Sequence, residues 1–175
     1  MKYFTLCLFF VLAACGLQGP HVTIKSDRHS KDVEIYGWGS SIDETPEETF
    51  RLWRLRSYIN KKTHAVNHRL YVTVAYFGDT KYFNRAADET VKNLPVTGQH
   101  IRGENCSRER CEVDEYIEIA LSDQDLRQHT NSRYTVELYA KNGDSLMITI
   151  APEMTRQQLE AIDKYVSNNP ASSAP

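Results

Sequence analysis

Two alternating stretches near the end of the chain constrain its fold more tightly than any other feature. Their apolar side chains stand at even positions only: Tyr134, Val136, Leu138 and Ala140, then Leu146, Ile148 and Ile150. Because successive side chains of a strand point to opposite faces, facing residues of a hairpin must have an even sum to bring the two apolar rows together. A two-residue loop at Asn142-Gly143 would give an odd sum. We therefore predict a three-residue loop, Lys141 to Gly143, with Gly143 in the left-handed region, that pairs Leu138 with Leu146 and Val136 with Ile148.

The remaining patterns indicate more strands than helices. The strongest predicted strand is 69–77, which is rich in β-branched and aromatic residues. Further strands are predicted at 33–38, 81–87, 94–101 and 113–121. A short helix is predicted at 123–129 behind Ser122, and a C-terminal helix at 155–166, where Thr155 and Gln158 form a capping box. The predicted fold class is α+β, mainly antiparallel β-sheet with these two helices.

The segment from residue 46 to 59 admits two interpretations. Thr45-Pro46 is typical of a helix start with proline in the first turn, so a helix through residue 57 stays open. Further on, the pattern has period two, because Trp53, Leu55, Ser57 and Ile59 alternate with Arg54, Arg56 and Tyr58. We favour a turn or short helix at 46–49 followed by a strand at 51–59.

The beginning of the chain has the features of an export signal. Lys2 precedes an apolar run that starts at Tyr3. At about a dozen residues this run is too short for a bilayer, which needs roughly 20. The run ends in Leu12-Ala13-Ala14-Cys15, which resembles the lipobox of bacterial lipoproteins. The resemblance implies cleavage before Cys15 and acylation of that residue. Gly16 after the cysteine resembles the outer-membrane sorting pattern, so for a Gram-negative host we expect a lipid anchor in the outer membrane, on its periplasmic face.

This interpretation divides the chain into a signal peptide (1–14), a lipidated tether (15–32), a single β-rich domain (33–166) and a disordered tail (167–175). The tether can hold one short strand at 21–25. Cleavage leaves 161 of the 175 residues, enough for one domain with its own core. Without Lys2 the chain has 20 basic and 23 acidic residues, a formal net charge of −3. This balance argues against a protein that coats nucleic acid.

Cysteine usage agrees with an exported protein. Cys7 leaves with the signal, Cys15 takes the lipid, and Cys106 and Cys111 remain as a pair. In an oxidising periplasm a lone pair five positions apart is typical of a disulfide. The alternative, half of a zinc site, lacks a second cysteine pair. We predict a Cys106–Cys111 disulfide, no metal site and no cofactor.

Candidate catalytic residues are sparse. His64 and His68 have the spacing of a helical metal pair, but no glutamate follows His64 and segment 60–68 is predicted to be a polar loop. We interpret both as solvated loop histidines. The sequence contains no recognisable set of nucleophile, base and orienting residue. We therefore predict that the protein is not an enzyme, and a hydrolase is the least favoured function.

One charge pattern suggests a binding surface. From Phe50 to Gly78 the chain contains no acidic residue, whereas basic and aromatic residues are interleaved there. The candidate binding surface consists of Arg51, Trp53, Arg54, Arg56, Tyr58, Lys61, Lys62, Arg69 and Tyr71. Such a surface can contact anionic envelope material, which includes lipid headgroups, lipopolysaccharide phosphates or an acidic protein. We favour the alternative that the run is the ordinary solvated face of an antiparallel sheet.

The same region contains a series of short motifs. They are Arg56-Ser57-Tyr58-Ile59-Asn60, Thr63, His68-x-Leu70-Tyr71-Val72 and Tyr76. Together they resemble a group of uncharacterised exported proteobacterial proteins, over roughly residues 50 to 166. That group also has a Cys…Cys…Glu stretch, a terminal hairpin and a closing helix, which correspond here to Cys106, Cys111, Glu115, Gly143 and Leu159. In the first turn this chain has Asn60 and His64 where the group has aspartate and glycine. The resemblance implies a similar fold and assigns no activity.

These observations favour a non-catalytic lipoprotein of the cell envelope that acts through interaction or structure at the membrane. Its expected partners, besides the membrane itself, are another envelope protein or an anionic envelope component. The alternative is a periplasmic module that binds a ligand or glycan through the surface around residues 51–71. That function would require a concave pocket lined by Trp53, Tyr58 and Tyr71.

Overall fold

Strands dominate the computed structural model, which describes residues 22–41, 48–104 and 111–170. In chain order the elements are β1 (Thr23–Ser26), β2 (Asp32–Ser41), β3 (Glu48–Asn60), β4 (Val66–Phe77), β5 (Phe83–Asp88), β6 (Asn93–Leu94), β7 (Val96–Glu104), β8 (Glu112–Leu121), α1 (Asp123–Gln128), β9 (Tyr134–Ala140), β10 (Ser145–Ile150) and α2 (Pro152–Asn168). The strand pairs are antiparallel. The predicted α+β class, with one short helix and one C-terminal helix, is therefore confirmed.

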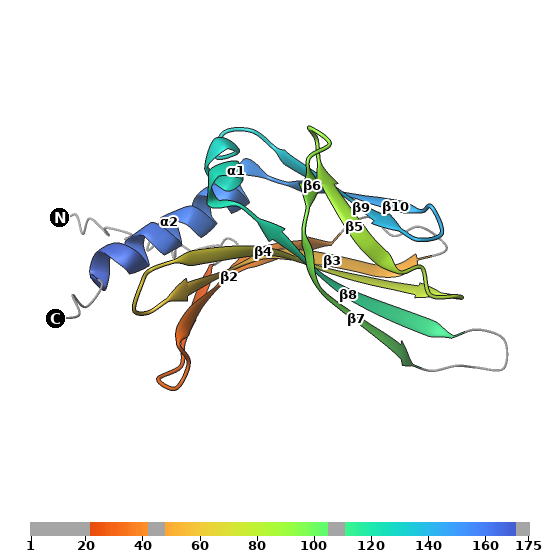
Figure 1. Ribbon diagram of the computed structural model, residues 1–175, viewed down its shortest axis with the longest axis horizontal. Coiled ribbons are helices and arrows are strands. Elements are labelled where there is room, and N and C mark those ends of the chain that lie inside the picture. Colours follow the sequence, from red (N-terminus) through yellow and green to blue (C-terminus); the bar gives the residue numbers. More distant parts are fainter. Residues whose placement is uncertain (1–21, 42–47, 105–110, 171–175) are drawn as a thin grey trace, which may run out of the picture.

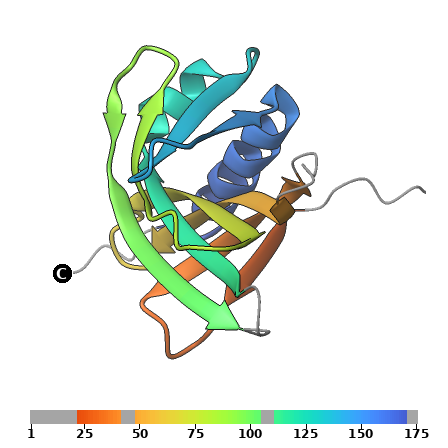
Figure 2. The ribbon, with the colours of Figure 1, turned by 90° about the vertical axis from the view of Figure 1, so that its right-hand side faces the viewer.

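The strands form two sheets that lie one over the other. The large sheet has the order β1-β2-β3-β4-β8-β7, and the small sheet has the order β10-β9-β5-β6. The small sheet and α2 lie beside each other on the same side of the large sheet (Figures 1 and 2). Helix α2 contacts β2 and β3, whereas β5 contacts β7 and β8. We call this covered side of the large sheet its inner face and the opposite side its outer face.

The core lies between these two layers because alternate residues of each strand point inward. On β3 the inner row contains Trp53, Leu55 and Ile59, all buried. The small sheet and α2 contribute the facing apolar side chains, which include Phe83, Tyr134, Val136, Leu138, Leu146, Ile148, Ile150, Met154, Leu159 and Ile162. Trp38 also ties α2 to the large sheet, since its indole N–H donates to Gln157 Oε1 at 2.9 Å.

The hairpin of β9 and β10 has the predicted register. Leu138 faces Leu146 and Val136 faces Ile148, and all these side chains are buried. Gly143 ends the three-residue loop with a φ of +95°, a conformation that L side chains rarely adopt. The even positions of both arms therefore form one row, which is buried except at Ala140, where it is partly exposed.

Helix α2 starts earlier than predicted, so the capping box at Thr155 is wrong. Ala151 occupies the N-cap position, and Pro152 lies in the first turn, where its missing N–H leaves no hydrogen bond unmade. Thr155 is fully buried inside the helix. The helix continues to Asn168 and so takes in the first residues of the predicted tail, while residues 171–175 lie outside the described residues.

The ambiguous segment is a strand, because β3 begins at Glu48 and runs without interruption to Asn60. A helix over residues 48–57 is therefore wrong, and residues 42–47 lie outside the described residues. Strand β1 belongs to the large sheet, so the folded domain begins before residue 33, where we predicted its start.

The predicted signal peptide (1–14) and Cys15 lie outside the described residues. Among the residues that are described, none of the helices is long and apolar enough to cross a membrane.

Candidate functional site

The outer face of β3 and β4 carries part of the predicted binding surface. Arg54 faces Tyr71 and Arg56 faces Arg69 across the two strands. Tyr58 follows on the same face of β3, because it lies at an alternate position. These side chains project opposite the core row, as the sequence predicts.

Trp53 does not belong to this surface. It lies on the inner face of β3 and is only 3% exposed, so it does not line a pocket with Tyr58 and Tyr71, as the ligand-binding alternative would require. The alternation of side chains along β3 explains this, because Trp53 lies two positions before Leu55 and therefore points to the same inner face.

The remaining predicted binding residues lie apart from this face or are not described. Lys61 and Lys62 are in the turn between β3 and β4, where Asn60 Oδ1 accepts the N–H of Lys62 at 3.0 Å. The ammonium group of Lys61 donates to the carbonyl of Asp27. Arg51 pairs with Val74 through its backbone position, but its side chain lies outside the described residues.

Arg56 is held by neighbouring side chains and presents no free charge. Its guanidinium lies 2.5 Å from Glu34 Oε2, and it also donates to the Tyr36 hydroxyl. The guanidinium carbon lies 4.3 Å from the ring centroid of Tyr36, 5.1 Å from that of Tyr58 and 5.0 Å from that of Tyr71. The hydrogen bonds from Tyr36 and Arg56 hold the pKa of Glu34 below its ordinary range, so the ion pair is neutral overall.

Arg54 differs from Arg56, although it is only two positions away. It is exposed, and the described part of the chain gives it no ion-pair or hydrogen-bond partner. Its neighbour on β2 is Gly39, where an added Cβ would come within 2.5 Å of the Trp53 carbonyl oxygen. Only glycine fits there, because the backbone of β3 comes so close to β2 at this point.

A shallow groove of about 220 Å³ surrounds Arg54 on the outer face. Its lining consists of Tyr36, Leu52, Arg54, Arg56, Tyr71, Thr73 and Tyr116. Tyr116 is the most open of its tyrosines, with 37% of its surface exposed. The groove therefore combines aromatic rings with one unpaired cation.

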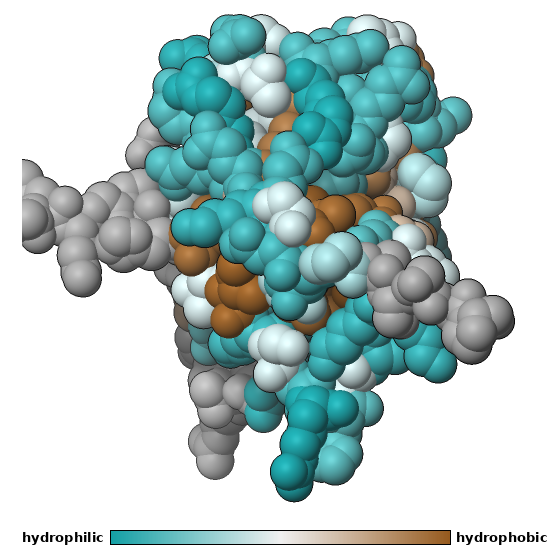
Figure 3. Space-filling model, turned by 90° about the vertical axis from the view of Figure 1, so that its left-hand side faces the viewer, coloured by the Kyte–Doolittle hydropathy of each residue, from teal (hydrophilic) through white to brown (hydrophobic). Residues whose placement is uncertain are grey.

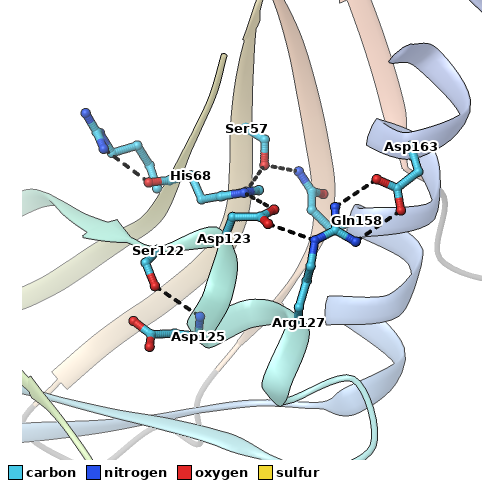
Figure 4. Close-up of polar contacts among 9 residues, drawn as sticks. Ser57, His68, Ser122, Asp123, Asp125, Arg127, Gln158 and Asp163 are labelled. Carbon is cyan, nitrogen blue, oxygen red and sulfur yellow. Dashed lines mark hydrogen bonds and ion pairs between the residues drawn. The ribbon is translucent and has the colours of Figure 1, made fainter. Parts of the chain in front are cut away.

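The inner face holds a series of hydrogen-bonded polar side chains that the sequence did not reveal. We call Ser57, His68, Asp123 and Gln158 the inner polar chain. Ser57 Oγ lies 2.8 Å from His68 Nδ1, and His68 Nε2 lies 3.2 Å from Asp123 Oδ1 (Figure 4). Ser57 and His68 are each only 1% exposed. Our interpretation of His68 as a solvated loop histidine is therefore wrong, because β4 begins at Val66 and places His68 on its inner row.

Gln158 fixes the direction of these hydrogen bonds. Its amide nitrogen donates to the Ile35 carbonyl at 3.0 Å and to Ser57 Oγ at 2.8 Å. Ser57 therefore accepts from Gln158 and donates to His68 Nδ1, which leaves the imidazole proton on Nε2 to bond Asp123. Burial lowers the pKa of His68 against the opposing effect of Asp123, so the ring is neutral.

The inner polar chain continues from Asp123 to the surface through a network of ion pairs. Arg127 Nε donates to Asp123 at 2.7 Å, and its two terminal nitrogens bond Asp163 of α2 at 2.8 and 3.2 Å. Partial burial acts to raise the pKa of Asp123, but the hydrogen bond from Arg127 holds it below the ordinary range. The network joins α1 to α2 at one end of the molecule.

A cleft of about 510 Å³ lies beside this network. Its lining consists of His64, Val66, Asp123, Arg127, Ile162, Asp163, Val166 and Ser167. Figure 3 views the side on which α2 ends and shows apolar side chains surrounded by polar ones. Each guanidinium nitrogen of Arg127 is already bonded to Asp123 or Asp163.

The order of donors in the inner chain is that of a serine–histidine–aspartate triad, but the exposure is reversed. In such an enzyme the serine must reach the substrate while the aspartate is buried. Here Ser57 is buried, whereas 45% of the Asp123 side chain is exposed. The arrangement therefore links β3, β4, α1 and α2 and gives no substrate access to Ser57 Oγ.

Glu115 is a second buried polar centre, on the inner face of β8. It is fully buried and accepts the backbone N–H of Tyr82 at 2.8 Å and of Phe83 at 2.9 Å. The Tyr76 hydroxyl donates to the same carboxylate. Burial, followed by this hydrogen bond, raises the pKa of Tyr76. Glu115 thus fastens the segment by which the chain passes from the large sheet to the small one.

The predicted disulfide is described only in part. Cys111 is disulfide-bonded, but Cys106 lies outside the described residues, so the pairing stays a prediction. Over the described ranges, no group of three or more His, Cys, Asp or Glu side chains is arranged to hold a metal ion.

Comparisons with known proteins add no assignment. No protein-family model, no curated protein and no solved structure matches the chain.

Proposed function

We propose that this chain is a non-catalytic lipoprotein of the bacterial cell envelope that binds an anionic envelope component through the outer face of its large sheet. Cys15 carries the acyl chains and anchors the protein in the outer membrane, with the domain in the periplasm. The lipobox-like sequence Leu12-Ala13-Ala14-Cys15 supports this anchoring.

The observation that carries the proposal is the character of the outer face. Both helices and the small sheet contact the inner face (Figure 2), and no described element covers the outer one. An ordinary solvated face needs only polar side chains. This face has tyrosines around a groove and the unpaired cation of Arg54, and aromatic residues and arginine are the types enriched at binding interfaces.

The inner polar chain supports a non-catalytic role. Ser57 is the nucleophile-like member of that chain, and it is 1% exposed beneath α2. A hydrolase would require this oxygen to approach a substrate.

Photo-crosslinking in the intact envelope tests the use of the outer face. Benzoylphenylalanine replaces Tyr116 on the outer face, with Met147 of β10 as the matched control, because Met147 is also exposed, at 62%. We expect an adduct from position 116 and none from position 147. Equal crosslinking at both positions, or none at position 116, would contradict the proposal.

Fractionation tests the anchor separately. Each buried methylene contributes about 0.8 kcal/mol to membrane binding, so several acyl chains hold the protein durably. Cys15→Ser should release the full chain from the membrane fraction. A variant that still sediments with membranes would refute the lipid anchor while leaving the outer face to be judged by crosslinking.

A second candidate function is a periplasmic glycan-binding module. The groove around Arg54 favours it, because small-molecule sites combine aromatic walls with a few polar groups.

A further inference from the structure

We infer that the groove around Arg54 is a binding site for a sugar ring that carries a carboxylate or a phosphate. The inference rests on the proposed function, because it names the ligand class of the same outer face. At about 220 Å³ the groove is smaller than the roughly 300–1,000 Å³ of pockets for drug-sized ligands. Its size therefore suits one ring and its substituent.

The acidic group of the ligand would bind at Arg54. Arg56 is already paired with Glu34, whereas Arg54 is exposed and has no partner in the described part of the chain. A guanidinium presents parallel N–H donors that match the oxygens of a carboxylate or a phosphate. Arg54 lines the groove, so its guanidinium is accessible to such a group.

The ring of the ligand would lie against tyrosines that the protein already holds in place. The Tyr71 hydroxyl bonds the Tyr58 hydroxyl at 2.8 Å and also Glu118. The Tyr36 hydroxyl donates to Glu34. Rigid aromatic side chains of this kind provide contact area at little cost in conformational entropy. Tyr116 and Thr73 face each other on β8 and β4 and extend the lining beside Arg54.

The charge of the groove argues against a lipid surface as the ligand. Basic segments that bind anionic membranes contain clusters of roughly 4–8 Lys or Arg residues. The groove offers only one unpaired cation among its described residues, since Arg56 is neutralised by Glu34. One cation beside aromatic rings matches a ligand with one acidic group and one ring.

The test titrates the full mature chain in detergent micelles with glucuronate and, separately, with glucose 6-phosphate. The readout is the ¹H–¹⁵N spectrum, which follows the Arg54 Nε–H signal and the backbone amides of β3 and β4. We expect saturable shifts at Arg54 and Tyr71 with at least one of the two acids. Glucose, acetate and inorganic phosphate should bind at least tenfold more weakly.

Two variants probe the two halves of the site. Arg54→Gln should weaken binding about tenfold or more, because it removes a charge-assisted hydrogen bond. Arg133→Gln is the matched control, since Arg133 is an exposed arginine in the connection between α1 and β9, and it should leave affinity unchanged. Tyr116→Ala removes ring contact while retaining Arg54 and should also weaken binding.

Glucose, acetate or phosphate binding as tightly as the sugar acids would overturn the inference, and so would an Arg54→Gln variant with wild-type affinity. If neither acid binds but position 116 still crosslinks in the envelope, the ligand class is wrong and the proposed function stands. If both experiments fail, the proposed function fails with it.

Discussion

Polar side chains have hydrogen-bond partners on the inner face of β3, whereas on its outer face Arg54 has none in the described chain. On the inner face, Ser57 accepts from Gln158 and bonds His68, so its hydroxyl is fully engaged by the protein. On the outer face, Arg54 stands three positions away with no partner in the described chain. Unpaired polar groups are costly in a core and cost little at a surface. The contrast teaches that the protein uses its inner polar groups for its own stability, whereas the outer cation is left to the ligand that we propose.

The largest expected effect comes from removing Glu115. Glu115→Ala would leave two buried donors, the backbone N–H of Phe83 and the Tyr76 hydroxyl, without their acceptor, together with the partly buried N–H of Tyr82. Each such group costs about 1–3 kcal/mol, so we expect a loss of about 3–5 kcal/mol in the free energy of unfolding. Urea denaturation measures it. Glu118→Ala, on the outer face of the same strand, should cost about 1 kcal/mol or less, and equal losses would abolish the distinction between the two faces.

A smaller loss is expected from Ser57→Ala. The change leaves His68 Nδ1 without its hydrogen-bond donor in the core, at a cost of about 1–3 kcal/mol. Thr73→Ala on the outer face of β4 is the matched control and should remain within about 0.5 kcal/mol of the wild type. A neutral Ser57→Ala substitution would show that the inner chain does not stabilise the fold.

The free energy of unfolding should depend on pH through the protonation of His68. Burial lowers its pKa below the ordinary 6.5, so the unfolded chain binds a proton more readily than the folded one. The stability contributed by the neutral ring is therefore fully present above pH 6.5 and is lost as pH falls below that value. Ser57 and Asp123 bond the ring, and Arg127 and Arg69 are the cations that act on it.

Denaturant melts between pH 5 and 7.5 would measure this loss. We expect His68→Gln to flatten the dependence and His64→Gln, in the neighbouring turn, to leave it unchanged. An equally steep dependence in the His68→Gln variant would assign the effect to other groups.

The smallest effect on stability is expected from Arg54→Ala. An exposed side chain without a partner contributes within about 0.5 kcal/mol, so the melting curve should match that of the wild type. Arg56→Ala provides the comparison, because it breaks the ion pair with Glu34 and the contacts with three tyrosine rings. If Arg54→Ala lowered the stability and Arg56→Ala did not, Arg54 rather than Arg56 would be the arginine that stabilises the fold.

Local patterns predicted much of the fold. The even-numbered apolar rows of the terminal hairpin were sufficient to give its loop length and register, because both depend on neighbouring residues alone. Thr155 misled the prediction of α2, since a capping sequence lay three residues inside a helix that Pro152 starts. The outer position of Arg54 and Arg56 also followed from alternation.

The inner polar chain could not be predicted in this way. Ser57 occurs in an otherwise apolar row, which was the one available signal for a buried polar group. Its partners come from α2 and β4, and the partner of His68 comes from α1, 55 positions away in the sequence. A buried histidine and a solvated one look alike until tertiary structure brings their partners together.

The place of Glu115 in the topology has a consequence for the kinetics of folding. Strands β1 to β4 pair with their neighbours in sequence, whereas β8 returns to β4 only after β5, β6 and β7. Closing that longer loop costs more chain entropy, so the four-stranded meander should form first. Glu115 gains its partners on β4 and β5 only in the later step. Glu115→Gln should then accelerate unfolding in stopped-flow experiments and leave the refolding rate nearly unchanged, whereas slower refolding would place β8 in the early nucleus.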